Sequence, residues 1–367
     1  MAGAMLVLTT ACDADLPSAS TPEVEDQGNE PLECSIPASE IYGGGPRKDG
    51  IPAITDPKWV SWGDAGAEYL EPDDRVVGFM VDGQPYAIPL NILWWHEIVN
   101  VNLGDHPFSV THCPLTGSSL AFDRVAADGA EFGVSGMLYQ NNLIMYDRND
   151  VESLWPQMLA GARCGVRDGT PLPMVPIIEM EWEGWTAVNP NTLVMPNVTG
   201  WDRNYTVYPY GDYNELNNSS TFFPQDVDTR RPPKERALGV ATEVGTTVFP
   251  YGVMDQLGEL VVLRETVGGT DMVVFWSREA QGAAAFHTAL DGEPLSFTVQ
   301  EGRIVDQESG STWRMDGLGL EGPRAGERLV PVAEAYVAFW FAWATFHPEL
   351  RIWGSGSDSG PGRHGGA

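Results

Sequence analysis

The side chains best suited to chemistry in this chain are the thiol of Cys113, in H-C-P-L-T, and the imidazole of His96, in W-W-H-E-I. An imidazole beside a thiol takes up its proton and makes the sulfur a better nucleophile. A carboxylate from Glu97 or Asp123 would orient the imidazole. The pattern predicts thiol-based catalysis or a redox thiol, with His96 as acid and base.

The same two residues allow two other interpretations. Thiolate and imidazole are ligands for copper or zinc, so His96 and Cys113, joined by Met145, would form a mononuclear metal site. Free cysteine is also among the residue types most often buried, so Cys113 would then be a small core residue. In that case the chain would be a non-catalytic ligand-binding or scaffold module. The sequence requires no cofactor and leaves open whether the chain is an enzyme.

A second candidate site lies in the segment Y-Q-N-N-L-I-M-Y-D-R. Tyr139, Asn141 and Asn142 offer donors and acceptors for a small-molecule or protein ligand, and Trp155 would close the same region. The alternative is a polar hairpin turn with an Asn-rich tip, because asparagine is favoured in turns.

Residues next to Cys113 limit these possibilities. Successive side chains of an extended strand point to opposite faces, so His112 is not expected to share a pocket with Cys113. Thr116 stands where a C-x-x-C motif would place its second cysteine. A dithiol oxidoreductase is therefore disfavoured.

The elements that must position these residues are mostly strands. Runs of five to eight residues rich in Val, Phe, Tyr, Thr and Trp are separated by D-G, T-G, G-G and S-G turns. Helices are expected only in 90–100 and 335–346. The predicted fold is mainly β and antiparallel, with a few short helices.

Two parts of the chain share a series of landmarks, which predicts two tandem β-rich repeats packed together. The matched pairs are Gly78/Gly239, Pro89/Pro250, Phe122/Phe286, Trp155/Trp313, Trp185/Trp343 and Pro190/Pro348. Glycine and tryptophan kept in both parts indicate turns, close approach and core volume. The second part has Ser277 in place of Cys113 and His287 in place of Asp123, so chemistry is expected in the first part alone.

These patterns divide the chain into segments. They are a signal over 1–12, a disordered acidic tether over 13–35, a first β-rich repeat with the candidate site over 36–196, a long inserted loop over 197–229, a second, degenerate repeat over 230–353, and a disordered tail over 354–367.

Charge and the first residues predict where the protein resides. The formal charge of −30, with three lysines, repels phosphate backbones and argues against nucleic-acid binding. The opening M-A-G-A-M-L-V-L-T-T-A-C resembles a bacterial lipoprotein signal, in which Cys12 receives the lipid. We therefore expect an exported protein of the cell envelope, attached to the membrane through Cys12. Cys34 and Cys164 would be free to form a disulfide there.

Longer strings resemble a known family. They are G-G-G-P-R-K-D-G-I-P-A-I-T-D-P-K-W-V, W-H-E-I-V-N, H-C-P-L-T-G-S-S, L-Y-Q-N-N-L-I-M-Y-D-R, S-L-W-P-Q and F-W-F-A-W-A-T-F-H-P. Over about 40–353 the chain resembles the bacterial and archaeal proteins called domain of unknown function 3179. The resemblance implies an exported or membrane-attached protein and no particular activity. Members often carry Cys-Pro-Leu-Cys or Cys-Pro-Leu-Thr at the position of Cys113 to Thr116, and this chain has only the first cysteine, which weakens a redox role carried over from the two-cysteine form.

Overall fold

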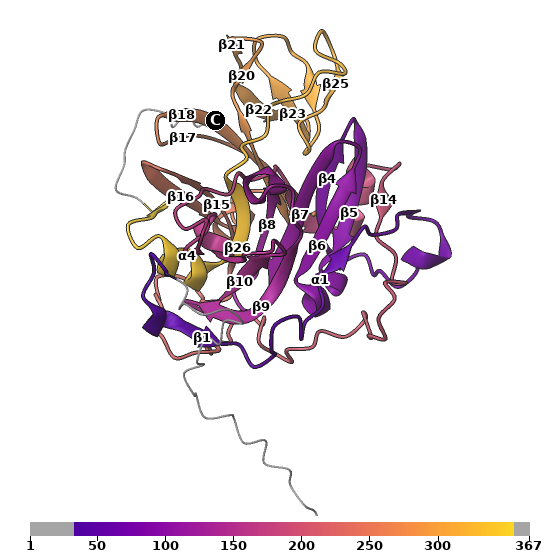
Figure 1. Cartoon of the computed structure of the whole chain (residues 1–367). Helices are drawn as coiled ribbons and strands as arrows, with labels where there is room; N and C mark the ends of the chain where they lie inside the picture. Colours follow the sequence, from indigo (N-terminus) through magenta and orange to yellow (C-terminus); the bar gives the residue numbers. More distant parts are fainter. Residues whose placement is uncertain (1–32, 356–367) are drawn as a thin grey trace, which may run out of the picture.

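The computed structural model describes residues 33–355, and the fold is mainly antiparallel β, as predicted (Figure 1). The largest sheet has eight strands in the order β2 (Ile54–Thr55), β6 (Ile98–Leu103), β7 (His106–Cys113), β8 (Ser118–Asp123), β26 (Ala335–Phe339), β15 (Arg236–Thr242), β16 (Gly245–Pro250) and β27 (Arg351–Ile352). Strands β8 and β26 join the first part of the chain to the second, where Ser119 pairs with Val337. The largest buried cluster also draws on both parts, since it contains Phe122 and Trp155 together with Trp343.

The remaining strands form smaller sheets. One has the order β13 (Ile178–Glu181), β4 (Arg75–Val81), β5 (Gln84–Pro89), β14 (Leu193–Val194) and β3 (Val60–Ser61), and another the order β1 (Ile41–Gly43), β9 (Phe132–Tyr139), β10 (Asn142–Asp147), β11 (Ser153–Pro156) and β12 (Cys164–Gly165). The second part adds β17 (Leu260–Val267), β18 (Thr270–Ser277) and β19 (Gly282–His287), the hairpin β20 (Ala289–Leu290) and β21 (Glu293–Pro294), and the sheet β22 (Phe297–Gln300), β23 (Arg303–Asp306), β24 (Thr312–Trp313) and β25 (Gly319–Glu321). In Figure 1 the sheet of β22 to β25 lies at the end of the molecule opposite β1 and β9.

The helices are short and differ in part from the expected ranges. They are α1 (Leu90–His96), α2 (Trp182–Val188), α3 (Tyr251–Asp255) and α4 (Trp340–Phe346), with single 3-10 turns η1 (Ala38–Glu40), η2 (Ala65–Ala67), η3 (Arg124–Ala127) and η4 (Gln157–Leu159). The helix predicted over 90–100 ends at His96, because Glu97 takes a φ of 57° and turns the chain into β6. The stretch 335–339 is strand β26, and only the residues after it are helical. Helices α2 and α3 were not predicted.

The two parts of the chain share a succession of elements and several strand pairings. A hairpin, β4–β5 or β15–β16, runs directly into a helix in each part. A later strand, β13 or β26, pairs antiparallel with the first strand of that hairpin, and a short strand, β14 or β27, pairs parallel with its second. The tandem duplication itself stays a prediction, and these shared pairings are the structural argument for it.

The first described residues are bonded to the body of the protein. Cys34 and Cys164 form a disulfide, and the amide of Ser35 donates to the Arg163 carbonyl at 2.9 Å. The predicted tether over 13–35 therefore includes three residues, 33–35, that belong to the folded part. The signal ending at Cys12 and the rest of the tether lie outside the described residues.

The inserted loop over 197–229 contains turns and bends but no strand or helix. It packs on both parts of the chain. The Asn141 amide donates to the Phe223 carbonyl at 3.1 Å, and the Trp340 indole donates to the Asp228 carbonyl at 3.1 Å. The insert thus covers the region where the predicted site lies.

Candidate functional site

The thiol of Cys113 lies at the end of β7 and is buried. Its sulfur lies 3.8 Å from the carbonyl oxygen of Asn141. Burial raises the pKa of the thiol to about 11, and the nearby carboxyl of Glu97 adds to this rise. A thiol with this pKa is protonated at neutral pH, whereas a nucleophilic cysteine needs a lowered pKa.

His96, the predicted base, has a different set of partners. Its Nδ1 lies 2.7 Å from the carbonyl oxygen of Pro52, and its Nε2 lies 2.7 Å from the Tyr205 hydroxyl. Since a carbonyl only accepts, Nδ1 carries the proton and Nε2 accepts from the hydroxyl. Burial lowers the pKa of His96 to about 4, so the ring is neutral at pH 7. Both nitrogens are occupied by groups other than Cys113, which corrects the predicted pairing of imidazole and thiol.

Glu97 is the carboxyl that interacts electrostatically with the Cys113 thiol. It follows α1 with a φ of 57° and a ψ of −32°, a backbone conformation that L-residues rarely adopt and that costs energy. Its carbonyl accepts from the His112 amide at 2.8 Å, which fixes the end of the helix beside β7. The side chain is buried, and desolvation raises its pKa to about 8, although a hydrogen bond with Tyr210 partly offsets the rise. The carboxyl is therefore protonated at neutral pH.

Tyrosines of the insert complete this group, and the sequence reasoning missed them. The Tyr210 hydroxyl is hydrogen-bonded to Glu97, and Tyr208 interacts electrostatically with Cys113. The Tyr213 hydroxyl donates to the Leu115 carbonyl at 2.9 Å. The spacing Y-T-V-Y-P-Y-G-D-Y is a dense set of aromatic hydroxyls in a segment without strand alternation, and it is the signal that could have found them.

The predicted ligand-binding residues are used inside the protein. Asn142 donates to Thr116, Ser118 and Gln157 and accepts from the Met158 amide at 2.9 Å. Asn141 accepts from the Phe223 amide at 2.6 Å and so fixes the insert. The hydrogen bonds of Asn141 and Asn142 indicate that these side chains hold the insert and the neighbouring loops in place.

The two aromatic candidates are also part of the packing. The Trp155 indole donates to the Asp147 carboxylate at 2.7 Å in the core. Tyr139 packs edge-on against Phe346, with 6.1 Å between the ring centroids. The predicted ligand groove over Tyr139, Asn142 and Trp155 is thus replaced by a set of internal contacts.

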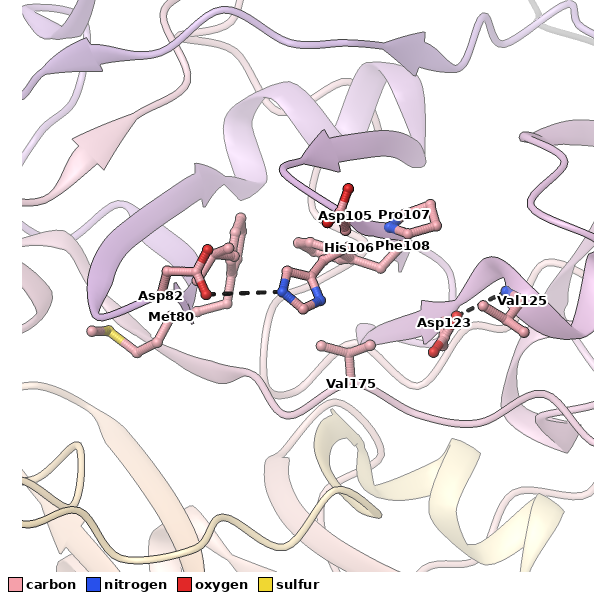
Figure 2. A pocket seen from close by; sticks show the side chains of 11 residues that line it. Met80, Asp82, Asp105, His106, Pro107, Phe108, Asp123, Val125 and Val175 are labelled. Atoms are coloured by element: carbon pink, nitrogen blue, oxygen red, sulfur yellow. Dashed lines mark hydrogen bonds and ion pairs between the residues drawn. The ribbon is translucent and has the colours of Figure 1, made fainter.

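Asp123 lies apart from the thiol. Its carboxylate accepts from the Val125 amide at 2.8 Å and caps η3. Figure 2 shows it on the wall of a surface pocket of about 340 Å³, together with His106 and Asp82, whose side chains are 3.9 Å apart. Asp123 therefore belongs to this pocket and does not orient His96, contrary to the prediction.

The predicted metal site lacks a ligand set. Among residues 33–355 no group of three or more histidine, cysteine, aspartate and glutamate side chains is arranged to hold a metal ion. His96 uses both nitrogens for other bonds, and Met145 is buried in the core cluster.

His112 and Cys113 do have different neighbours, as expected for a strand. The Nδ1 of His112 lies 2.9 Å from the hydroxyl of Ser119, which in turn donates to the carboxylate of Glu179 at 2.6 Å. Burial lowers the pKa of His112 to about 4. A buried polar group around Glu179 thus lies on the other side of β7 from the thiol.

Fold and site together define a mainly β protein in which an irregular insert covers a buried carboxyl, thiol and tyrosine group. The chain belongs to the family described as "Protein of unknown function (DUF3179)", whose model matches residues 48–350. Comparison with curated proteins gave no match, and neither did comparison with solved structures. Within residues 33–355 no helix has the length and hydrophobicity needed to cross a membrane.

Proposed function

We propose that the protein is a cell-envelope lipoprotein whose first β-rich part carries an acid–base site built on Glu97 and Cys113. The observation that carries this proposal is the Glu97 carboxyl, which is buried on a strained backbone and has its pKa raised to about 8. Strongly perturbed acids and strained residues cluster at functional sites. A purely structural role at this position could be filled by an uncharged residue, which would not require burying an acid.

A protonated carboxyl in a dry site can donate a hydrogen bond or a proton to a bound molecule. Since Cys113 is neutral as well, the site carries no charge of its own at pH 7. It therefore suits a polar, uncharged ligand, such as one with a carbonyl group, better than an ion. The insert, through Tyr210 and Tyr213, would exclude water from the ligand.

The thiol is less suited to act as the nucleophile. With a pKa of about 11, roughly one molecule in ten thousand would carry a thiolate at pH 7. In this proposal Glu97 is the acid, and the uncharged thiol of Cys113 lines the site beside it. The same neutral thiol also favours the second candidate function, a binding module that performs no reaction.

The proposal includes the cellular location of the protein, which is the cell envelope. Cys12 would be the lipidated residue, and a disulfide such as Cys34–Cys164 is typical of exported proteins in oxidising compartments. Expression in a bacterial host with lipoprotein processing should place the full chain in the membrane fraction and Cys12→Ser in the soluble fraction. Equal distribution of the two proteins would remove the anchor from the proposal.

The acid–base site is tested by a thermal-shift screen of polar, uncharged metabolites against the full chain. Glu97→Gln keeps the shape and the neutrality of the side chain but cannot release a proton. Cys113→Ala is the matched variant, because it removes the neighbouring thiol and leaves the Glu97 carboxyl in place. Compounds that use the site should stabilise the wild type more than Glu97→Gln. Compounds that stabilise both proteins equally would show that binding does not involve Glu97.

A further inference from the structure

Two arginines share one buried carboxylate at the boundary between the two parts of the chain. Arg75 donates from Nε to Glu179 Oε1 at 2.7 Å, and Arg236 places its Nε 3.5 Å from the same oxygen. The other oxygen of Glu179 accepts from the Ser119 hydroxyl at 2.6 Å. The two guanidinium groups and the one carboxylate together carry a net charge of one positive unit, and all three side chains are largely buried.

The two arginines occupy matching positions in the two parts. Arg75 is the first residue of β4 and Arg236 the first residue of β15, each three residues before the matched glycine. Strand β13 places Glu179 opposite Val77, and the equivalent strand β26 places Val337 opposite Leu238. The arginine is thus present twice and the carboxylate only once, which is the origin of the excess positive charge.

Several polar atoms around this charge have no hydrogen-bond partner among residues 33–355, although Nε of Arg236 keeps its ion pair with Glu179. They are Nη2 of Arg75, Nε of Arg236 and the hydroxyl of Tyr208, all of them buried. Tyr208 comes from the insert and interacts electrostatically with Arg236. A buried polar atom without a hydrogen-bond partner destabilises the folded state, so proteins rarely keep such atoms without a reason.

Neighbouring groups engage part of this donor set, since the side chain of Tyr251 interacts with both arginines and is hydrogen-bonded to Arg75. Arg75 uses Nη1 for the Gln281 carbonyl at 3.0 Å. Glu181 is within electrostatic reach of both arginines, but no ion pair within 4.0 Å joins it to either in the described part of the chain. Parts of both arginines are exposed, 23% of the Arg236 side chain and 11% of the Arg75 side chain, whereas Arg75 Nη2, Arg236 Nε and the Tyr208 hydroxyl are buried.

We propose that Arg75, Arg236 and Tyr208 form a binding site for a small carboxylate. One negative charge balances the net charge of the arginines and Glu179, whereas a dianion would leave an excess of negative charge in a low-dielectric place. A guanidinium fork matches the two oxygens of a carboxylate, and a tyrosine hydroxyl adds a third donor. This site is separate from the Glu97 carboxyl and stands without the acid–base function proposed for it.

Acetate is the simplest probe of this site. Thermal unfolding of the full chain should be followed while acetate replaces chloride at constant ionic strength and pH 7. The site predicts a saturable rise in the unfolding midpoint with acetate. The same titration with sulfate should give little or no saturable rise. An unchanged midpoint in acetate, or a larger rise in sulfate, would overturn the proposal.

Variants separate the site from general salt effects. Arg236→Gln and Tyr208→Phe each remove a donor and should abolish or reduce the acetate-dependent rise. Arg278→Gln is the matched control, because Arg278 makes an exposed ion pair with Glu259 in the second part of the chain. Arg236→Lys keeps the positive charge but lacks the two parallel N–H donors of a guanidinium. It replaces Arg236→Gln as the test if that variant fails to fold. An acetate response that is the same in Arg236→Lys, Tyr208→Phe and wild type would contradict the assignment.

Discussion

The first and second parts of the chain use the same contacts for packing. A Cβ atom added to Gly78 would lie 2.3 Å from the Trp185 ring, and one added to Gly239 would lie 2.3 Å from the Trp343 ring. Each glycine is therefore required by the tryptophan that covers it. These shared contacts are what the fold needs in both places.

A second contact is also repeated. The Trp155 indole donates to Asp147 at 2.7 Å, and the Trp313 indole donates to Asp306 at 2.8 Å. Buried polar groups in both parts are thus paired in the same way, which satisfies the carboxylate in the core.

The two parts differ in their polar interior. His112, Cys113 and Glu179 stand in the first part, whereas the second has Trp276, Ser277 and Val337 at the corresponding strand positions. The helices also end differently. Helix α1 is followed by Glu97 at a φ of 57°, and α3 by Gln256 at an ordinary φ of −72°. The shared glycines and tryptophans thus hold the fold in both parts, whereas Glu97 and Cys113, with tyrosines of the insert, form a polar group that the second part lacks.

The largest expected effect tests the shared packing. Trp185→Ala and Trp343→Ala each remove a buried ring from the same type of contact, so each should lower the free energy of unfolding by about 3–5 kcal/mol. Urea denaturation of the two variants measures this. A large loss in one and a negligible loss in the other would break the structural equivalence of the two parts.

The next effect is a pH dependence that belongs to the first part. The unfolded chain releases the Glu97 proton near the ordinary pKa of 4.5, and the folded protein keeps it until about 8. The folded state thus binds more protons between these values, and its stability falls as pH rises through this window, by about 1.4 kcal/mol per unit. Glu97→Gln should lack this contribution. Parallel pH profiles of unfolding free energy for the two proteins would contradict it.

A smaller effect concerns the repeated indole bond. Trp155→Phe and Trp313→Phe keep most of the ring but leave Asp147 and Asp306 without one donor each, so each should cost about 1–3 kcal/mol. Thermal or urea unfolding gives the comparison. The two losses should agree within about 1 kcal/mol if the contacts are equivalent.

The smallest effect on stability is expected at the thiol. Cys113→Ala should change the free energy of unfolding by about 1 kcal/mol. In the native wild type, iodoacetamide should leave Cys113 unmodified, since the thiol is buried and neutral. Ser277→Cys in the Cys113→Ala background places a thiol at the half-buried matching position, where it should react much faster. Rapid alkylation of native Cys113 would show an activated thiol.

The sequence predicted the mainly β class because that class depends on local strand and turn patterns. It predicted His96 as the partner of the thiol, with Glu97 or Asp123 orienting the ring. In the structure His96 bonds Pro52 and Tyr205, and Glu97 is the carboxyl that interacts electrostatically with Cys113. The reason is the turn at Glu97, whose positive φ no residue pattern indicated. The hydroxyl of Tyr210 comes from an insert without periodicity, so its position depends on long-range contacts alone.

The matching positions of Arg75 and Arg236 could have been recognised from the sequence. Both stand three residues before a matched glycine, a shared position that by itself indicates a residue of the fold. Shared position does not exclude function where the surroundings differ. Glu179 supplies that difference and could be recognised only from the pairing of β13 with β4.

The central claim, that the first part holds a protonated carboxyl in its interior, is tested most directly by infrared titration of Glu97. The spectrum of Glu97→Gln is subtracted from that of the wild type at each pH, which isolates the one carboxyl. We expect a protonated carboxyl band at pH 7 that disappears with a midpoint of about 8. A carboxyl already ionised at pH 6 would contradict it.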